Sequence, residues 1–403
     1  MAPYLQAARN MGLEVLIASR GQHSLTTEIS EGLHVDLDNH DAALQRILAA
    51  DRHTPFTGIL GSDDSTVELA ADAARQLGLP HNPPEAARLS RRKDLARAHL
   101  ALAGCPVPIH CLIDVEKPLQ PQMDGLPWPC VLKPLHMSAS RGVIRADNPA
   151  EFKQACHRIR PIAGEYGDDF ERRHLLVEDY IDGIEVAYEG YLHQGTLNTL
   201  ALFDKPEPLQ GPYFEETIYV TPSRLTPKTQ ALITQRVAEA CHAYGLTTGP
   251  VHAELRVNDD DAWILEVAAR TIGGDCARTL DSSGELNLEA LTIALAIDQP
   301  VEPRSLEGAR GVMMLPIEQG GILRRVEGTL AAGRVTHIEK VDIIIREGHE
   351  LVPLPEGNQY PGYLFARADT PDEVVTALHT AHGRLKFIVA PVIKMHRAAD
   401  TSA

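Results

Sequence analysis

The amino-acid sequence predicts a multidomain protein of mixed α/β and α+β class, and two patterns support this prediction. Helix-like and strand-like segments alternate over residues 1–90, which is typical of a parallel, doubly wound sheet. Residues 305–395 instead mix strands and helix between glycine turns at 320–321, 333 and 357–358. A chain of 403 residues is long enough for two or three domains with a large core.

In the first 90 residues, apolar runs that predict strands alternate with segments of helical apolar spacing. The predicted strands are 14–19, 33–37 and 58–62, and the predicted helices are 3–11, 41–50 and 64–77. A helix at residue 3 that leads into a strand at residue 14 normally follows a strand of its own. We therefore expect a truncated Rossmann-like domain, either because the start codon is misplaced or because the domain is degenerate.

The same criteria place further elements along the rest of the chain. They predict helices at 89–104, 149–159, 225–244 and 286–297, and strands at 129–134, 175–181 and 185–192. We therefore expect the truncated domain at 1–90, a central domain at 91–300, a C-terminal α+β domain at 301–395 and a mobile tail at 396–403.

Composition excludes several classes of protein. The chain is 44% hydrophobic and 23% charged, which is ordinary for a globular protein. Its net charge of −17 argues against a nucleic-acid partner, or an anionic membrane, held by a basic surface. No apolar run approaches the ~18 residues of a membrane helix, and the N-terminus lacks the layout of a signal peptide. The six cysteines are scattered without a C-x-x-C pair, so we expect reduced thiols in a cytoplasmic protein.

Two strand-like segments around residue 260 are the most informative part of the chain. Segments 250–257 and 262–270 flank the tripeptide 259–261, Asp-Asp-Asp, which predicts a hairpin with a three-residue loop. Such a loop pairs 257 with 263, 255 with 265 and 253 with 267. In this register the apolar side chains of both strands share one face.

The other face of this hairpin predicts a metal site. Glu254 lies opposite Glu266 with Cβ atoms about 5 Å apart, and Arg256 and Arg270 share the face. Like charges in opposite positions destabilise a sheet, and a divalent cation between the carboxylates would offset that cost. Mg²⁺ is commonly held by one or two carboxylates together with substrate phosphates. The alternative is an exposed hairpin whose carboxylates pair with the two arginines.

A glycine turn follows the second strand. In Arg270-Thr271-Ile272-Gly273-Gly274 the arginine can grip a phosphate or carboxylate with two parallel hydrogen bonds, and the glycines can turn backbone N–H groups toward an anion. The order Glu254, then Glu266-x-x-x-Arg270-x-x-Gly273-Gly274, resembles the ATP-grasp superfamily, specifically its carboxylate–amine ligases. The resemblance covers nearly the whole chain and implies an ATP-grasp fold, with two subdomains of residues 91–300 that clasp ATP.

A lysine strand and a small loop match the superfamily in the same order. The apolar strand 130–134 carries Lys133 near its end, where the lysine must extend to solvent or meet an anion. The following small loop reads as a phosphate-binding loop or as an ordinary surface turn. By resemblance, the ATP-binding residues here are Lys133, Ser138, Ser140 and Gly142. Lys93 matches an earlier ATP-contacting lysine, although spacing alone favours a solvated lysine on a helix face.

Two strands around Gly183 resemble the side of the site that binds adenosine. Adenine needs backbone donors and acceptors between apolar walls. By resemblance, the adenine-reading residues are Glu178, Asp179, Tyr180 and Ile181, and Glu185 accepts the ribose hydroxyls. The alternative places these glutamates on an exposed strand face.

The stretch 203–222 combines prolines with several aromatic residues, as a loop that lines a substrate pocket can. It is similar to L-amino-acid ligases (dipeptide synthases), which have a lysine–proline turn here and then a phenylalanine and glutamate. The resemblance makes Glu216 and Tyr219 substrate-binding and places Lys205 near the second substrate or the γ-phosphate. These ligases commonly have histidine at the position of Tyr219, so recognition of the substrate amine is in question.

The sequence therefore predicts an ATP-dependent ligase. ATP converts a small carboxylate, favoured to be an amino acid, into an acyl phosphate that an amine attacks, with release of ADP and phosphate. Lys205 and Arg270 are the expected catalytic residues, and Gly273 and Gly274 help Arg270 to hold the carboxylate or its acyl phosphate.

The expected cofactors are ATP and Mg²⁺ or Mn²⁺. Many superfamily members have a metal-binding asparagine where this chain has Ala268, so the metal would rest on Glu254 and Glu266 with phosphate oxygens and water. The expected partners are small-molecule carboxylates and amines, without nucleic acid or membrane. The sequence does not decide whether the chain forms a homodimer.

Two rival functions stay open on the sequence alone. One is a carboxylase of the biotin carboxylase type, which activates bicarbonate by the same chemistry and needs a biotin-carrying partner. The other is a non-catalytic nucleotide-binding protein, which the shortened N-terminal domain makes plausible.

Overall fold

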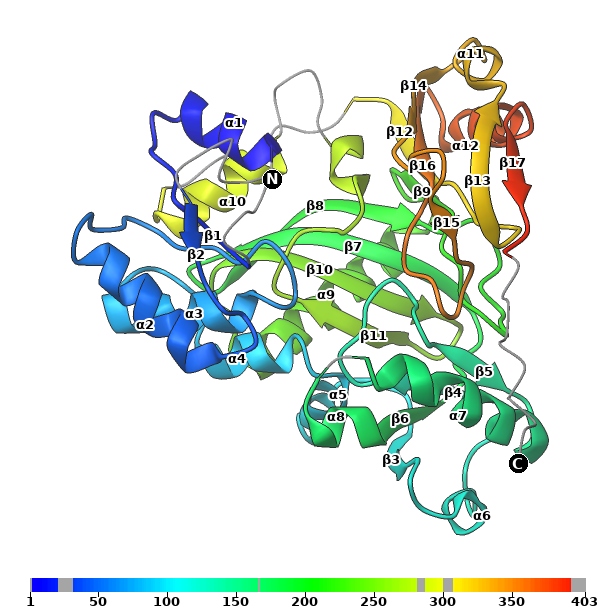
Figure 1. The fold of residues 1–403 in the computed structure, drawn as a ribbon, viewed down its shortest axis with the longest axis horizontal. Helices are drawn as coiled ribbons and strands as arrows, with labels where there is room; N and C mark the ends of the chain where they lie inside the picture. Colours follow the sequence, from blue (N-terminus) through cyan, green and yellow to red (C-terminus); the bar gives the residue numbers. More distant parts are fainter. Residues whose placement is uncertain (1, 21–31, 166, 281–286, 300–306, 393–403) are drawn as a thin grey trace, which may run out of the picture.

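The computed structural model describes residues 2–20, 32–165, 167–280, 287–299 and 307–392. A large sheet crosses the middle of the molecule, with N-terminal helices near one end and C-terminal strands near the other (Figure 1). A smaller four-stranded sheet forms a separate layer beside it. The tail predicted at 396–403 lies outside the described residues. Within the described part of the chain, the helices are too short or too polar to cross a membrane.

The N-terminal region contains a parallel strand pair, as the predicted doubly wound pattern requires. Its elements are α1 (Ala2–Asn10), β1 (Ile17–Ser19), β2 (Gly32–His34), α2 (His40–Asp51), α3 (Val67–Leu77) and α4 (Pro84–Leu89). The side chain of Asn39 caps α2, and Gly78, with a φ of 69°, ends α3. The strand predicted at 58–62 is wrong: this segment packs against α10 (Leu288–Ala296), so closely that a Cβ on Gly58 would lie 2.6 Å from the carbonyl oxygen of Ala296.

The large sheet has eight strands, each antiparallel to its neighbours. In spatial order they are β11 (Ala262–Ala268), β10 (Gly249–Val257), β7 (Ile184–His193), β8 (Thr196–Asp204), β9 (Ile218–Thr221), β12 (Ala309–Met314), β16 (Gly362–Ala368) and β14 (Ile338–Ile343). Because β9 pairs with β12, the sheet continues across residue 300, where the sequence predicts a domain boundary.

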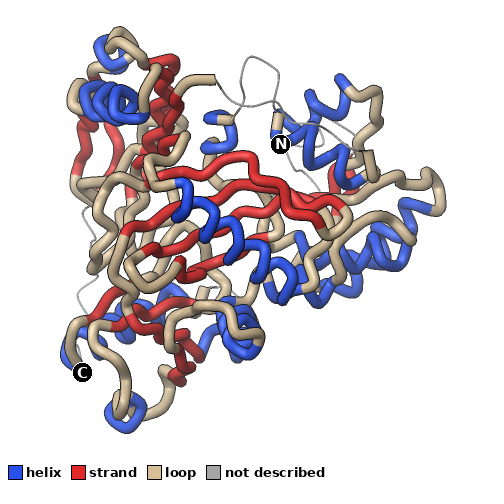
Figure 2. The backbone as a smooth tube through the Cα atoms, turned by 180° about the vertical axis from the view of Figure 1, so that it is seen from behind, coloured by secondary structure: helices blue, strands red, loops and turns tan. Residues whose placement is uncertain are grey.

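Apolar side chains cover both faces of this sheet. The helix α9 (Pro227–Tyr244), predicted at 225–244, lies across one face (Figure 2) and buries Ile233 and Val237 against Val251 and Leu255. The other face packs against α10 and the short helix η2 (Cys276–Thr279). These two layers hold β10, β7 and β11 rigidly, so side chains at the strand ends have fixed positions.

The four-stranded sheet carries the predicted lysine strand. Its strands, in spatial order, are β3 (His110–Asp114), β6 (His174–Asp179), β4 (Cys130–Pro134) and β5 (Ile144–Ala146). The helix α7 (Pro149–Ala163) buries Phe152 and Ile159 against this sheet. The helices around it are α5 (Lys93–Leu102), α6 (Leu119–Gln122) and α8 (Asp169–Arg173). The helix predicted at 89–104 therefore begins only at Lys93, because α4 ends at Leu89 and a turn separates the two helices.

The C-terminal region is α+β, as the sequence predicts. The helix α12 (Pro371–His382) buries Val374 and Leu378 against β12, β16 and β9. A second, three-stranded sheet consists of β15 (Glu350–Leu351), β13 (Gly321–Glu327) and β17 (Lys386–Ala390), and the short helix α11 (Thr329–Ala332) follows β13. The segment after β15 reaches back toward the four-stranded sheet, which brings the C-terminal region to the candidate site.

Candidate active site

The hairpin of β10 and β11 places Glu254 opposite Glu266, as the sequence predicts, and Ala253 opposite Val267. The other two predicted pairs are wrong. Position 255 pairs with 264, and position 257 pairs with 262. The loop between the strands has four residues rather than three, because β10 ends at Val257 and β11 begins at Ala262. A β-bulge next to Glu254 adds one residue to β11, so the extra loop residue and the bulge cancel at the two glutamates.

The bulge also presents two backbone carbonyls to Arg97 of α5. Arg97 Nη1 donates to the carbonyl oxygen of Ile264 at 2.8 Å, and Nη2 donates to that of Leu265 at 2.7 Å. The Arg97 side chain is 3% exposed, and its Nε contacts the Glu178 carboxylate. Arg97 therefore connects β11 to the four-stranded sheet, and no sequence motif marks it.

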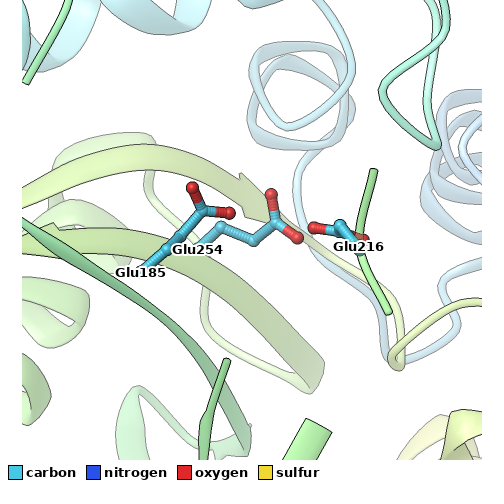
Figure 3. A group of neighbouring side chains, drawn as sticks. All are labelled: Glu185, Glu216 and Glu254. Carbon is cyan, nitrogen blue, oxygen red and sulfur yellow. The ribbon is translucent and has the colours of Figure 1, made fainter. Parts of the chain in front are cut away.

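A buried lysine joins three glutamates of the large sheet. Lys205 Nζ donates to Glu185 Oε1 at 2.8 Å and to Glu254 Oε1 at 3.1 Å, and it also contacts Glu216. The three carboxylates point toward one another from two neighbouring strands and the segment before β9 (Figure 3). One oxygen of each lies within 4.8 Å of the others, a spacing that suits a cation. The Lys205 ammonium supplies that cation in the structure.

This arrangement shifts the pKa values of Lys205, Glu216 and Glu254. Burial lowers the pKa of Lys205, but the charges of the three glutamates outweigh it and hold the value well above normal. Burial also raises the pKa of Glu216 to about 7, reinforced by the charge of Glu254 and opposed by Lys205. Burial alone would raise the pKa of Glu254, but Lys205 and then His252 hold it well below normal. Of Glu216 and Glu254, Glu254 is therefore the more firmly ionised carboxylate.

Behind Glu254 lies a buried His–Glu pair that the sequence analysis missed. His252 Nδ1 hydrogen-bonds Glu189 Oε1 at 2.5 Å, and its Nε2 lies 3.7 Å from Glu254 Oε1. Burial lowers the pKa of His252, but the two glutamates raise it to about 9. Strand alternation could have found both residues, because 252 shares a face with 254 on β10, and 189 shares a face with 185 on β7.

The two predicted ATP-contacting lysines reach the site from different elements. Lys133 Nζ on β4 lies 2.6 Å from Glu178 Oε2, and Lys93 Nζ at the start of α5 lies 2.9 Å from Glu266 Oε2. Burial raises the pKa of Glu178, but Arg97 and Lys133 outweigh it and hold the value at about 2. The Glu178 carboxylate is thus an ion-pair partner of Lys133, and its side chain is not available to read adenine.

The small loop after β4 is connected to the C-terminal region. The Gly142 N–H donates to the carbonyl oxygen of Pro355 at 2.9 Å, and Arg141 Nε donates to that of Glu356 at 2.8 Å. Gly142 has a φ of +71°, and a Cβ there would lie 2.7 Å from Pro134, so only glycine fits. Its contact with phosphate stays a prediction: in this structure its N–H is bonded to Pro355 and the residue does not line the cavity.

The predicted adenine side has aromatic and apolar walls. Tyr180 stacks on Phe214 with ring centroids 6.4 Å apart, and Val131 packs with them. Arg256 Nη1 donates to the carbonyl oxygen of Ile181 at 2.9 Å, and Arg256 Nε donates to Glu185 Oε2 at 3.1 Å.

The carboxylate of Glu185, predicted to accept the ribose hydroxyls, already has a partner on each oxygen. One of its carboxylate oxygens binds Arg256 and the other binds Lys205, so a ribose hydroxyl would share an oxygen that is already bonded. Asp179 keeps a buried carboxylate oxygen with no hydrogen bond from the described residues. Burial raises the pKa of Asp179 accordingly.

Arg270 follows β11 and faces the same cavity as Glu266. Its Nε donates to Asp64 Oδ1 at 2.7 Å, and its Nη1 donates to the carbonyl oxygen of Thr271 at 3.0 Å. Gly273 and Gly274 follow it, and Gly274 adopts a φ of +55°. The sequence left open that the two hairpin arginines pair with Glu254 and Glu266. In the structure they have other partners. Arg256 pairs with Glu185 and Arg270 with Asp64.

A cavity of about 420 Å³ brings these groups together. The predicted site residues that line it are Lys93, Lys133, Ser138, Ser140, Glu178, Asp179, Tyr180, Ile181, Glu185, Glu216, Tyr219, Glu254, Glu266, Arg270, Gly273 and Gly274. Gly142 and Lys205 do not line it, so the direct role of Lys205 at the γ-phosphate or second substrate stays a prediction. Its side chain is 2% exposed and bonded to three carboxylates.

Three family models match consecutive parts of the chain. The ATP-grasp N-terminal domain matches residues 5–81, the ATP-grasp domain matches 126–279, and L-amino acid ligase C-terminal domain 2 matches 313–390. The crystal structure of an L-amino acid ligase from Bacillus licheniformis superposes with a TM-score of 0.83 and 24% identity, and covers 96% of this chain and 95% of that one.

Two curated relatives are similar over smaller parts. Carnosine synthase 1 of Homo sapiens is 28% identical over 335 residues, which are 77% of this chain and 40% of that protein. Alanine–anticapsin ligase of Bacillus subtilis is 26% identical over 219 residues, 50% of this chain and 46% of that protein. The chain thus matches less than half the length of each. The three family models match ATP-grasp domains and an L-amino acid ligase C-terminal domain in this chain, and its fold resembles that of the L-amino acid ligase.

Proposed function

We propose that this protein is an ADP-forming ATP-grasp ligase that joins a small carboxylate, in the favoured case an amino acid, to an amine. One observation carries the proposal: a single cavity is lined by two lysines beside the small loop, by the facing carboxylates of Glu254 and Glu266, and by Arg270. The relatives named as ligases and synthases support the same class of reaction.

We propose that Glu254 and Glu266 hold Mg²⁺ or Mn²⁺ with ATP. Their donors are oxygen atoms, which suit these hard cations, and both carboxylates line the cavity. Each carboxylate has a lysine partner in the structure, and this supports a cation at the same position. A bound metal ion would neutralise charge on the phosphates. Ala268 offers no metal ligand, so the remaining positions would fall to phosphate oxygens and water.

The chain's own residues would act mainly through position and charge. Lys133 and Lys93 both line the cavity and would bind phosphate oxygens of ATP. Arg270 would hold the substrate carboxylate beside the γ-phosphate. The carboxylate oxygen attacks the γ-phosphorus and ADP leaves, and the free amine then attacks the acyl carbon and phosphate leaves. Such reactions depend chiefly on alignment of the reactants.

We assign Lys205 a supporting role in this reaction. Its ammonium binds Glu185, Glu216 and Glu254 at once, so it sets the positions of two cavity-lining carboxylates and of the proposed metal ligand. Glu216 and Tyr219 stay the proposed substrate-binding residues, and Tyr219 donates to Glu216 Oε2 at 2.8 Å.

A turnover screen tests the proposal. Phosphate release from ATP is measured with single amino acids, pairs of amino acids that include alanine, and bicarbonate, each with Mg²⁺ or with EDTA. We expect Mg²⁺-dependent release with a carboxylate and an amine together, and a product with the mass of both substrates minus water. Turnover with bicarbonate alone would favour the biotin carboxylase alternative. ATP binding without turnover would favour a non-catalytic role.

We further propose a cytoplasmic location for the enzyme. The structure is consistent with reduced thiols, since all six cysteines are free and five of them are buried. The small-molecule partners follow from the proposed reaction, and a homodimer is left to be tested by the mass of the protein in solution.

A further inference from the structure

A tight turn of the N-terminal region delivers an acidic side chain to the cavity. The turn lies just before α3, and Gly61 is so close to α3 that a Cβ there would lie 2.8 Å from Val67. Asp63 folds back on the turn, with Oδ1 accepting from the Ser65 backbone N–H at 2.9 Å. Both residues line the cavity, but the Asp64 carboxylate binds Arg270 there.

Asp64 meets Arg270 at the cavity wall. Arg270 Nε donates to Asp64 Oδ1 at 2.7 Å, and Nη1 donates to the carbonyl oxygen of Thr271 at 3.0 Å. Nη2 makes no hydrogen bond to any residue that the structure describes. The side chains are only 14% and 25% exposed for Arg270 and Asp64 respectively, so water screens the pair little. Two of the three guanidinium nitrogens are therefore anchored, and the third is left for an anion.

We propose that Asp64 is a positioning residue that orients Arg270 toward the substrate carboxylate or its acyl phosphate. This inference rests on the proposed ligase function. An unanchored arginine samples many rotamers, and anchoring one side of the guanidinium removes that freedom before substrate arrives. A charge-assisted hydrogen bond to Nε also fixes the plane of the guanidinium, which decides where the free nitrogen points. The N-terminal region thereby takes part in the chemistry of the central domain.

Kinetics of Asp64→Ala and Asp64→Asn test the assignment, with Glu85→Gln as the matched control. Glu85 is an exposed partner of Arg75 in the same region. It does not line the cavity, so its substitution should not affect substrate binding. For Asp64→Ala we expect kcat/KM for the carboxylate to fall about 10- to 100-fold, the range for losing a hydrogen bond to a charged group. ATP affinity should be unchanged. Asp64→Asn keeps an acceptor oxygen and should recover much of the loss.

The opposite kinetic result would overturn the assignment. If Asp64 merely cancels the charge of Arg270, its removal should leave kcat unchanged and lower KM for the carboxylate, since a bare guanidinium attracts anions more strongly. If Asp64 only stabilises the fold, Asp64→Ala should lower Tm and weaken ATP binding together with carboxylate binding. Both outcomes differ from a selective loss in the carboxylate step.

A spectroscopic readout separates this inference from the proposed function. In ¹⁵N-arginine-labelled protein, the Arg270 Nε–H resonance, identified by its absence in Arg270→Lys, should be protected from exchange in the wild type, Asp64→Asn and Glu85→Gln. It should lose protection in Asp64→Ala. If the wild type shows no carboxylate-dependent turnover, the ligase proposal fails, and this resonance still decides whether Asp64 orients Arg270. Equal protection in Asp64→Ala would refute the positioning role.

Discussion

Arg158 on α7 and Glu356 after β15 form a two-point ion pair, with Nε–Oε1 at 2.6 Å and Nη2–Oε2 at 2.9 Å. The same C-terminal segment accepts backbone and side-chain hydrogen bonds from Gly142 and Arg141. Through these contacts the C-terminal region holds the small loop that lines the proposed phosphate end of the cavity. The position of the loop thus depends on residues more than 200 positions away in the sequence.

Breaking this ion pair should loosen the loop only modestly. Glu356→Gln removes the charge, but both side chains are about two-fifths exposed and the backbone hydrogen bonds stay. Exposed pairs contribute about 0.2–1 kcal/mol, so we expect the Kd for ATP to rise by less than about fivefold, and less still in high salt. Titration of ATP at two salt concentrations measures this. A loss of ATP binding that is independent of salt would show that Glu356 has a different role.

Glu266→Gln should abolish metal-dependent turnover while the fold stays intact. The change removes the charge but little volume, and Glu266 is only partly buried beside Lys93. We expect loss of Mg²⁺-stimulated phosphate release of at least about 100-fold, similar to that on adding EDTA to the wild type. Isothermal titration with Mg²⁺ and an ATP analogue gives the matching affinity. Wild-type turnover and metal affinity in this variant would contradict the assignment of Glu266.

Lys133 and Lys205 should differ in what they support. Lys133→Ala should weaken ATP binding, because Lys133 lines the cavity beside the small loop. Lys205→Met should instead cost about 3–5 kcal/mol of stability, because three buried carboxylates lose their shared cation. Chemical unfolding and ATP titration of both variants separate the roles. Added Mg²⁺ should restore part of the stability of Lys205→Met, and no restoration would argue that the cluster cannot accept a metal ion.

Stability in acid should depend on Glu178. Its pKa is lowered from 4.5 to about 2, since the charges of Arg97 and Lys133 outweigh burial. A lowered pKa stabilises the fold at pH values above 4.5, and this contribution, about 3 kcal/mol, is lost as pH falls from about 4.5 to 2. Glu178→Gln should therefore lower stability at pH 7 and flatten the pH dependence over that window. Urea unfolding at a series of pH values checks both effects, and an unchanged acid slope would contradict them.

The sequence by itself determined those parts of the site that depend on local spacing. Side chains alternate along a strand, so the position of Glu254 opposite Glu266 was predictable from the two apolar patterns. This pairing was correct although the predicted loop was one residue too short. The longer loop and the bulge shift the register by one residue in opposite directions. The position of Lys133 near the end of β4 was likewise predictable, since an apolar run leads up to it and a small loop follows.

Only the tertiary structure decided which charges meet. Lys93 pairs with Glu266 across 173 residues, and Arg270 pairs with Asp64 across 206. Lys205, just after the end of β8, places its ammonium among Glu185, Glu216 and Glu254. Strand periodicity specifies the face of a residue but not the partner that another segment brings to it. That choice depends on how the separate layers pack, because packing alone brings distant segments within hydrogen-bonding distance.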